Sequence, residues 1–365
     1  MTKTLAKTIL KQAVKVCSWI LYGATLLAAY GGYMNPDWWT LPSIGVLFFP
    51  YLAIATLLVA GVWLATKRFI TGGAGILVLM ACGPTFLEAV PFRFGNKASN
   101  PQRTFKMITF NCLHMNDTQL PDNDYNRSLH FLIHSGADFI CLQELYGFFT
   151  PEIPERYRAQ VDSLVKIYPY YSADPWREIE FASKYPFKQL NIKLEDNMKF
   201  GNIAAYEMEI DGEPLTVINV HLPSYRLSKN ERNVITNVKS KAGLKASIKE
   251  LEGSIYSKMK KAFKQRAKVS KALAEYASTV KGNVIICGDF NDVPGSWSYR
   301  TFMKKGFEDA YAQTGFGHLI TYNRHLMYFH IDQILYRGDL VPLNVRKKRM
   351  DASDHYPLLA EFEFL

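Results

Sequence analysis

Three long stretches without a charged residue occupy the first quarter of the chain. They run from Val16 to Tyr33, from Leu41 to Thr66 and from Phe69 to Leu87, and they hold 18, 26 and 19 residues. A helix needs about 20 apolar residues to cross the roughly 30 Å hydrocarbon core of a bilayer. The stretches therefore predict three transmembrane helices in a membrane anchor at residues 1–91. The third is the weakest of these predictions, because that stretch contains several glycines and Pro84.

The flanking charges predict on which side of the membrane the rest of the chain lies. Basic residues precede the first stretch and separate the second from the third (Lys3, Lys7, Lys11, Lys15, Lys67 and Arg68). Because basic flanks stay in the cytoplasm, three crossings predict a remainder outside a bacterial-type plasma membrane, with Trp38 and Trp39 at the outer interface.

Two alternatives stay open at this point. If the third stretch is only interfacial, the remainder lies in the cytoplasm, which Arg93, Lys97 and Arg103 favour. A cleaved signal peptide is the alternative for the first stretch, but the two stretches that follow it argue against a soluble product.

The rest of the chain has the composition of a globular domain. Phe92 to Thr104, with its Gly, Asn, Ser and Pro, is predicted to be a linker, and residues 105–365 a second domain. Of the five cysteines, Cys17 and Cys82 fall in the apolar stretches, and three stand in or beside apolar runs (Cys112, Cys141 and Cys287). Their spacing implies neither a disulfide framework nor a zinc site.

Polar groups stand next to several short apolar runs that read as buried strands. The run Asn283–Cys287 leads into Gly288-Asp289-Phe290-Asn291, and Ser353-Asp354-His355 precedes a run that alternates apolar and acidic residues up to Phe364. Four further runs carry a polar residue at or near one end (Asn111, Glu144, His221 and Asp332). The ends of rigid strands are places where catalytic side chains can be held in position.

These residue types match the requirements of phosphate-ester hydrolysis, which needs a cation, a held water and donors for developing charge. Mg²⁺ prefers oxygen ligands and uses few carboxylates, so Asn111 and Glu144 are predicted as its ligands. An imidazole at His221 could protonate a leaving oxygen or bind the phosphate. A buried carboxylate at Asp332 would fix the tautomer of His355 and favour its imidazolium form.

The order of these pieces resembles the endonuclease/exonuclease/phosphatase superfamily, the deoxyribonuclease I-like fold. The pieces are Asn111, Gln143-Glu144, Ser183-Lys184-Tyr185-Pro186, Asn219-Val220-His221-Leu222, Gly288-Asp289-Phe290-Asn291, Ile331-Asp332 and Ser353-Asp354-His355. The resemblance covers residues 105–365. It implies an α/β fold of the α+β kind: a four-layer sandwich of two packed mixed sheets flanked by helices, here preceded by the three transmembrane helices.

The resemblance also implies a role for most of the pieces. Glu144 would be the principal Mg²⁺ ligand, with Asn111 beside it and Asp354 near the metal, and Mn²⁺ would be a possible substitute. Asp289 would orient or deprotonate the attacking water, and Asn291 would hold the phosphate or that water.

Two histidines complete the implied site. His355, with Asp332 as its partner, would contact the scissile phosphate, and His221 would act as general acid or as a second phosphate contact. A histidine at position 221 favours the deoxyribonuclease I-like, sphingomyelinase-like and inositol-phosphatase-like branches over members that incise abasic DNA.

The sequence departs from the family pattern in two segments. Glu178 and Glu180 stand in the strand before Ser183, where the family usually has small residues, and either acid could pair with His221 or face solvent. His330 and Gln333 flank the Ile-Asp pair where the family often has arginine and tyrosine, which weakens the expected phosphate contact on that side.

The positive charge of the chain is concentrated in one segment. Tyr225 to Lys271 holds fourteen Lys/Arg and three Glu, a balance of +11, whereas the whole chain has +10. Within it, residues 225–264 are predicted as a basic helical segment and Gln265 to Val280 as an outer helix of the sandwich. Such a segment can lie on anionic lipid or follow a polyanionic strand, and a merely solvated helical face is the open alternative.

The sequence thus predicts a membrane-anchored, Mg²⁺-dependent phosphodiesterase. Its substrate would be a nucleic acid or a phospholipid head group, its surroundings the lipid bilayer, and no obligatory protein partner is implied. The alternative is a catalytically silent, membrane-tethered binding module of the same fold.

Overall fold

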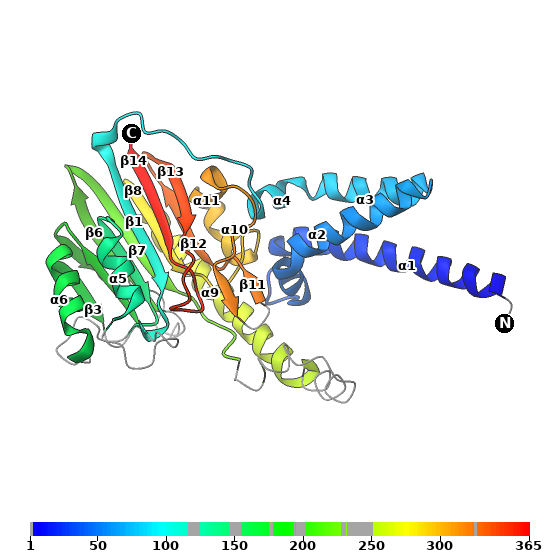
Figure 1. Cartoon of the computed structure of the whole chain (residues 1–365), viewed down its shortest axis with the longest axis horizontal. Helices are drawn as coiled ribbons and strands as arrows, with labels where there is room; N and C mark the ends of the chain where they lie inside the picture. Colours follow the sequence, from blue (N-terminus) through cyan, green and yellow to red (C-terminus); the bar gives the residue numbers. More distant parts are fainter. Residues whose placement is uncertain are drawn as a thin grey trace.

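The first part of the chain is an all-helical hairpin bundle. The computed structural model describes residues 3–115, 125–145, 155–174, 178–192, 194, 202–227, 231, 251–324 and 327–365. The helices of the bundle are α1 (Lys3–Tyr30), η1 (Gly31–Tyr33), α2 (Leu41–Ala65), α3 (Phe69–Ala81) and α4 (Gly83–Ala89). Figure 1 shows α1, α2 and α3 projecting together from one side of the rest of the molecule.

Two of these helices are long and apolar enough to cross a membrane. They cover Lys7–Tyr33 and Leu41–Ala65, which agrees with the first two predicted spans. The third predicted span is not one straight helix, because α3 and α4 are bent by 59° at Cys82. Pro84 stands in the first turn of α4, where backbone N–H groups have no partner within the helix, so the N–H that proline lacks costs no hydrogen bond. The proline ring also prevents α3 from continuing.

Two six-stranded sheets form the centre of the second part. The first sheet has the order β13 (Leu340–Lys347), β14 (Leu358–Phe364), β1 (Thr104–Asn111), β2 (Phe139–Gln143), β4 (Ile179–Ser183) and β3 (Tyr170–Asp174). The second has the order β5 (Phe187–Leu190), β6 (Asn202–Ile210), β7 (Glu213–His221), β8 (Asn283–Asp289), β12 (Asp332–Arg337) and β9 (Glu308–Asp309). A separate hairpin consists of β10 (Tyr322–Arg324) and β11 (Met327–Phe329).

Helices cover the outer faces of both sheets. Those of four or more residues are α5 (Arg127–His134), α6 (Arg158–Ile167), η5 (Leu251–Ile255), α9 (Tyr256–Thr279), α10 (Trp297–Met303) and α11 (Ala310–Thr314). Short 3-10 turns are η2 (Pro101–Arg103), η3 (Leu113–Met115) and η4 (Glu155–Tyr157). The result is the predicted four-layer sandwich of two mixed sheets and flanking helices (Figure 1).

Alternation along the strands divides the apolar side chains between layers. In β1, Phe105 and Met107 enter the core between the sheets, whereas Ile108 and Phe110 pack under α5 and α6. The second sheet packs its outer face against Leu273 of α9 and its neighbours in the same way. Strand β8 is buried along its whole length, as expected where both faces of a sheet are covered.

The strand directions bring the predicted polar ends to one edge of the sandwich. Strands β1 and β2 are parallel, as are β7 and β8, and His221 stands opposite Asp289 in the second pair. Strand β12 is antiparallel to β8 and begins where β8 ends, with Asp332 opposite Asp289. Polar residues from distant parts of the sequence therefore meet at the same edge.

The segment predicted as a linker, Phe92 to Thr104, lies along the sandwich and is hydrogen-bonded to it, and its last residue already belongs to β1. The backbone N–H of Arg93 donates to the Gly315 carbonyl at 2.8 Å, and that of Asn96 donates to the Leu343 carbonyl at 2.7 Å. The Glu363 carboxylate accepts bonds from the backbone of residues 99 and 100.

The helical bundle and the sandwich share an apolar cluster. Val46 and Leu47 of α2 pack against Phe263, Val293 and Phe329 of the sandwich. We call this group, together with Ile331, the junction cluster.

Polar contacts and close backbone packing join the same two parts. Arg300 of α10 forms an ion pair with Glu88 of α4 at 2.9 Å and donates to the Tyr33 hydroxyl at 2.9 Å. Gly32 packs so closely that a Cβ there would lie 1.8 Å from the Gly295 carbonyl oxygen.

The predicted basic segment is described only at its two ends. Residues 228–230 and 232–250, in the middle of the predicted basic helical segment, lie outside the described residues. Helix α9 begins at Tyr256 and covers the predicted outer helix, Gln265 to Val280, up to Thr279. Figure 1 shows its N-terminal half extending from the sandwich towards the side on which the helical bundle projects.

Candidate active site

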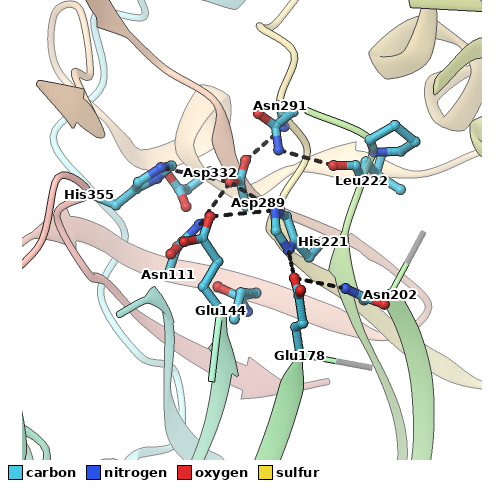
Figure 2. A network of polar contacts seen from close by, with 12 residues as sticks. Asn111, Glu144, Glu178, Asn202, His221, Leu222, Asp289, Asn291, Asp332 and His355 are labelled. Carbon is cyan, nitrogen blue, oxygen red and sulfur yellow. Dashed lines mark hydrogen bonds and ion pairs between the residues drawn. The ribbon is translucent and has the colours of Figure 1, made fainter. Parts of the chain in front are cut away.

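Seven of the eight predicted site residues meet at the strand ends (Figure 2). They come from β1, β2, β7, β8, β12 and the loops next to them (Asn111, Glu144, His221, Asp289, Asn291, Asp332 and His355). Two groups of close ligand atoms share Asp289: one with Glu144 and His221, and one with Asp332 and His355. In each group these atoms lie within 4.8 Å of one another, so Asp289 is the centre of the site.

Two carboxylates face each other across the Asn111 amide. The Asn111 Nδ2 donates to Glu144 Oε1 and to Asp289 Oδ2, both at 3.0 Å. Asp289 is 1% exposed, and burial raises the pKa of its carboxyl, an effect opposed first by the nearby His355 imidazole. Asp289 is buried and Glu144 is partly exposed, and their ligand oxygens lie within 4.8 Å of each other, so two negative charges there repel unless a cation or a proton lies between them.

The donor set suits a hard divalent cation. Glu144 and Asp289 offer carboxylate oxygens, and rotation of the Asn111 amide would present its Oδ1 on the same side. Oxygen donors with room for water are what Mg²⁺ requires. No cysteine takes part, which argues against a soft-metal site among the residues that the structure describes.

His355 is held by a buried carboxylate. Its Nδ1 is 2.8 Å from Asp332 Oδ2, and its Nε2 is 3.7 Å from Asp289 Oδ2. Burial acts to lower the pKa of His355, but the charges of Asp332 and Asp289 outweigh it and raise the pKa to about 10. The imidazole is therefore a cation at neutral pH, as the sequence predicts for a group that faces a phosphate.

His221 lies between three carboxylates. Its Nε2 is 3.7 Å from Glu144 Oε1 and 3.8 Å from Asp289 Oδ2, and its Nδ1 is 3.8 Å from Glu178 Oε2. The Asn202 amide donates to the same Glu178 oxygen at 3.3 Å. Of the two acids left open by the sequence, Glu178 is thus the one that faces His221, as Figure 2 shows.

Asn291 closes the loop after β8. Its backbone N–H donates to Asp289 Oδ1 at 2.8 Å, and its Nδ2 donates to the Leu222 carbonyl at 3.0 Å. The residue has a φ of 50°, a left-handed conformation that asparagine tolerates better than most residues. This turn fixes the Asp289 carboxylate against its neighbours.

Of the predicted acidic and histidine site residues, Asp354 is the one that neither group of ligand atoms contains among the described residues. Its backbone carbonyl accepts from the Asn323 N–H at 3.1 Å, and its carboxylate helps to raise the pKa of His355.

A layer of buried amides below the site was not predicted. Gln143 Nε2 donates to Asn219 Oδ1 at 2.7 Å, and Asn219 Nδ2 donates to the backbone carbonyls of Leu142 and Glu180. These bonds join the two sheets directly under Glu144 and His221. Period-two spacing could have indicated Asn219, since it lies two residues before His221 and points to the same face.

The buried side chains of Arg266 and Gln333 support the loop after Asp289 through their contacts with Asp292. Asp292 is buried, and its Oδ2 is 3.5 Å from Nε of the fully buried Arg266. Gln333, which departs from the family pattern, donates to the Asp292 carbonyl at 2.7 Å. Burial lowers the pKa of His330, the other departure, to about 3, so this side chain is neutral and supplies no charge to the site.

Two family models match the chain. One, described as the endonuclease/exonuclease/phosphatase family, matches residues 108–355, and one described as a domain of unknown function matches residues 11–87. A UPF0294 protein of Vibrio campbellii is 26% identical over 191 residues, which are 52% of this chain and 51% of that protein. The chain therefore spans about half the length of the curated relative it matches.

Solved structures also share the chain path of the sandwich. A humanized TDP2 of D. rerio is 16% identical with a TM-score of 0.49, over 72% of this chain and 99% of that one. A beta toxin of Staphylococcus aureus is 17% identical with a TM-score of 0.42, over 70% of this chain and 99% of that one. Likenesses of this size carry no information about the substrate.

Proposed function

Because the chain belongs to the endonuclease/exonuclease/phosphatase family, we propose that it is a membrane-anchored phosphodiesterase that depends on Mg²⁺, with Mn²⁺ as a possible substitute. The observation that carries the proposal is the convergence of Glu144, Asp289, His221 and His355 at one edge of the sandwich. The substrate class is a phosphodiester, in a nucleic acid or in a phospholipid head group.

The proposed cation site uses Glu144, Asn111 and Asp289. These residues would hold the ion, which would supply positive charge to the phosphoryl oxygens of a bound substrate. Asp289 orients the attacking water or accepts its proton, and Asn291 holds the phosphate or that water. Asp354, which we predicted near the metal, acts through its charge on His355.

The two histidines have different tasks in this proposal. His355, kept charged by Asp332, donates to a phosphoryl oxygen and stabilises the negative charge that develops there. His221 donates a proton to the leaving oxygen, and Glu178 faces its other ring nitrogen at 3.8 Å.

The anchor supports a location of the catalytic centre outside the cytoplasm. Tyr33, at the end of the first span, and Glu88, at the end of the third, both contact Arg300, so both span ends lie on the side of the sandwich. The N-terminal lysines and the pair Lys67-Arg68 then lie on the opposite, cytoplasmic side. Alkaline phosphatase fused after Leu365 should be active in cells, and an inactive fusion together with a fluorescent GFP fusion would contradict this topology.

The activity is tested with the purified full chain and bis(4-nitrophenyl) phosphate. Chelation of divalent ions should abolish hydrolysis, and Mg²⁺ or Mn²⁺ should restore it. Glu144→Gln should raise the Mg²⁺ concentration needed for half-maximal rate, whereas Glu361→Gln, on β14 away from the site, should not. Metal-independent hydrolysis would refute the proposed chemistry, and binding of a phosphodiester without hydrolysis at any metal concentration would favour a silent binding module.

A further inference from the structure

An apolar groove lies between the anchor and the catalytic part. It has a volume of about 580 Å³, within the roughly 300–1,000 Å³ typical of small-molecule sites. Its walls are formed by α2, by η5 and the start of α9, by strand β11 of the hairpin, and by the segment after His221. Among the residues that the structure describes, those that line it are apolar or tyrosine and none is charged; they include Ile44, Leu47, Tyr225, Met259, Tyr328 and Phe329.

The groove and the catalytic centre share two walls. Tyr225 lines the groove and follows His221 by four residues in a short connection. Phe329 lines the groove from β11 and pairs with Tyr322 of β10, whose ring lies 5.1 Å from that of His355. The groove walls therefore belong to two segments that also lead to the catalytic histidines, one directly along the chain to His221 and one through Tyr322 to His355.

Buried Arg266 fixes the first of these walls. Its guanidinium donates to the Pro223 carbonyl at 2.7 Å and to the Tyr225 hydroxyl at 2.9 Å, and it lies over the Tyr225 ring at 4.6 Å. The same side chain is next to Asp292 in the catalytic loop. The groove wall and the loop that carries Asp289 are thus held by one cation.

The groove opens at the level of the outer membrane interface. Its α2 wall is the first part of an apolar helix long enough to span a bilayer. Lys264 of α9 donates to the Asp37 carbonyl at 2.9 Å, in the turn that carries Trp38 and Trp39. Exposed tryptophans mark the boundary between lipid and water. Lys264 therefore holds α9 next to the turn that carries the tryptophans.

We propose that this groove binds one alkyl chain of a lipid substrate whose phosphodiester lies at the catalytic centre. The inference rests on the proposed phosphodiesterase function and narrows its substrate class. An alkyl chain fits because the described residues of the lining offer no charged or amide side chain to a polar ligand, and because the first walls that a bilayer lipid meets are those of α2 and α9.

A nucleic-acid strand fits the groove less well. Strand-binding surfaces combine cations that follow the backbone with exposed aromatic rings. The four lysines on the first half of α9 are not among the residues that line the groove (Lys258, Lys260, Lys261 and Lys264). They can instead meet anionic lipid head groups at the rim.

The test compares two phosphodiesters that have the same leaving group, 4-nitrophenyl methyl phosphate and 4-nitrophenyl octyl phosphate. The full chain is held in an amphipathic polymer, because free detergent would compete for an alkyl site. Each methylene removed from water contributes up to about fourfold, so burial of about half of the octyl chain should raise kcat/KM roughly 10²-fold over the methyl ester.

Matched variants connect this ratio to the groove. Ile44→Trp fills the groove from α2, Met259→Trp fills it from α9, and Ile54→Trp enlarges an exposed residue of α2 that does not line it. The octyl-to-methyl ratio should fall towards one in both groove variants and stay at the wild-type value in Ile54→Trp. Hydrolysis of the methyl ester, measured for each variant, reports whether the catalytic part is folded.

The outcomes separate the inference from the function on which it rests. A wild-type ratio near one, or a high ratio that both groove variants keep, would overturn the alkyl-chain assignment and leave the phosphodiesterase intact. A ratio near one together with rapid hydrolysis of a single-stranded oligonucleotide would assign a nuclease instead. No hydrolysis of either ester with Mg²⁺ or Mn²⁺ would overturn the proposed function itself.

Discussion

At the scale of single residues, Asp289 has the most contacts with other site residues. It accepts hydrogen bonds from Asn111 and Asn291, and it faces both His221 and His355. Its burial raises the pKa of its carboxyl, and the nearby His355 opposes that effect. A neutral side chain of the same shape should therefore be tolerated by the fold and fail only in the chemistry.

Asp289→Asn is expected to lower kcat by about 10²-fold or more, since a positioned base or water anchor contributes on that order. Thermal unfolding of the metal-free variant should match that of the wild type. Asp138→Asn, at the opposite end of β2, is the matched control and should keep its turnover. Unchanged turnover of Asp289→Asn would remove this residue from the catalytic role.

The charge of His355 depends on Asp332. The pKa of His355 is raised above its ordinary value of 6.5 to about 10, so the stabilisation of the charged form is complete below pH 6.5 and is lost as the pH rises through about 10. Asp332→Asn removes one of the charges that raise the pKa and leaves burial, which lowers it. Histidine NMR titration of metal-free protein should show a lower midpoint for His355 in this variant.

The exposed Asp339→Asn provides the control for that titration, because Asp339 lies in the turn after β12, away from the site. An unchanged His355 midpoint in Asp332→Asn would show that the Asp332 carboxylate does not hold the imidazolium.

The sequence predicted which residues lie together at the candidate site, but not all of the contacts between them. Apolar runs with a polar end are visible in one dimension, and seven of the eight predicted residues meet in the structure. The partner of His221 stayed open because Glu178 has a φ of 52°, so its direction follows from the turn before β4 and not from strand alternation. Roles at the metal remain proposals.

At the scale of elements, the β7–β8 pair depends on Gly288. The residue has a φ of 140°, and a Cβ there would lie 1.9 Å from the Val220 carbonyl oxygen. Glycine alone allows the two strands to approach where His221 and Asp289 stand side by side. In the Gly-Asp-Phe-Asn segment, the close packing of the two strands thus requires the glycine, and the proposed chemistry requires the aspartate.

Helix α4 and helix α10 are joined by a largely buried ion pair. The side chain of Arg300 is 8% exposed, and that of Glu88 is 29% exposed. The guanidinium of Arg300 donates two hydrogen bonds to the Glu88 carboxylate, at 2.9 and 3.2 Å. Breaking a buried pair leaves a charge without compensation and typically costs about 3–5 kcal/mol. Because Glu88 is partly exposed, a smaller cost is expected here.

Glu88→Gln should lower the free energy of unfolding by about 2–3 kcal/mol, just below that range, in thermal unfolding of the full chain. Asp37→Asn breaks the exposed pair with Lys264 and should cost about 1 kcal/mol or less. Equal effects of the two variants would show that the Arg300 pair is no stronger than an exposed one.

The third predicted span shows the limit of sequence reasoning at this scale. Its glycines and Pro84 indicate a weak helix, but the bend of 59° depends on tertiary contacts. Thr85 donates to the Ala29 carbonyl of α1 at 3.0 Å and accepts from Arg300 at 3.1 Å. These contacts join residues that lie 56 and 215 positions apart, which no local pattern contains.

At the scale of the whole molecule, the anchor and the sandwich are not independent units. The junction cluster takes residues from α2 and from three separate parts of the sandwich. The sequence suggested a linker between two domains because composition changes at residue 92. The shared cluster was not visible, since Val46 and Leu47 look the same in sequence as any lipid-facing residue.

Removal of residues 1–91 should therefore expose Phe263, Val293 and Phe329, a contiguous apolar surface. The remaining fragment is expected to unfold at a lower temperature than the full chain and to associate in the absence of detergent. Size-exclusion chromatography and thermal unfolding with and without a mild detergent check this. A monomeric fragment with the stability of the full chain would mean that the cluster contributes little.

Contacts of Arg300 with both Tyr33 and Glu88 limit how the catalytic part can move. A domain on a flexible linker can take many heights above the membrane, but a domain held at two points stays at a constant height above the lipid. Its encounters are then governed by lateral diffusion and by the number of target molecules per unit area. Dilution of the cells or of the medium would leave such a rate unchanged, whereas dilution of the target among other lipids would lower it in proportion.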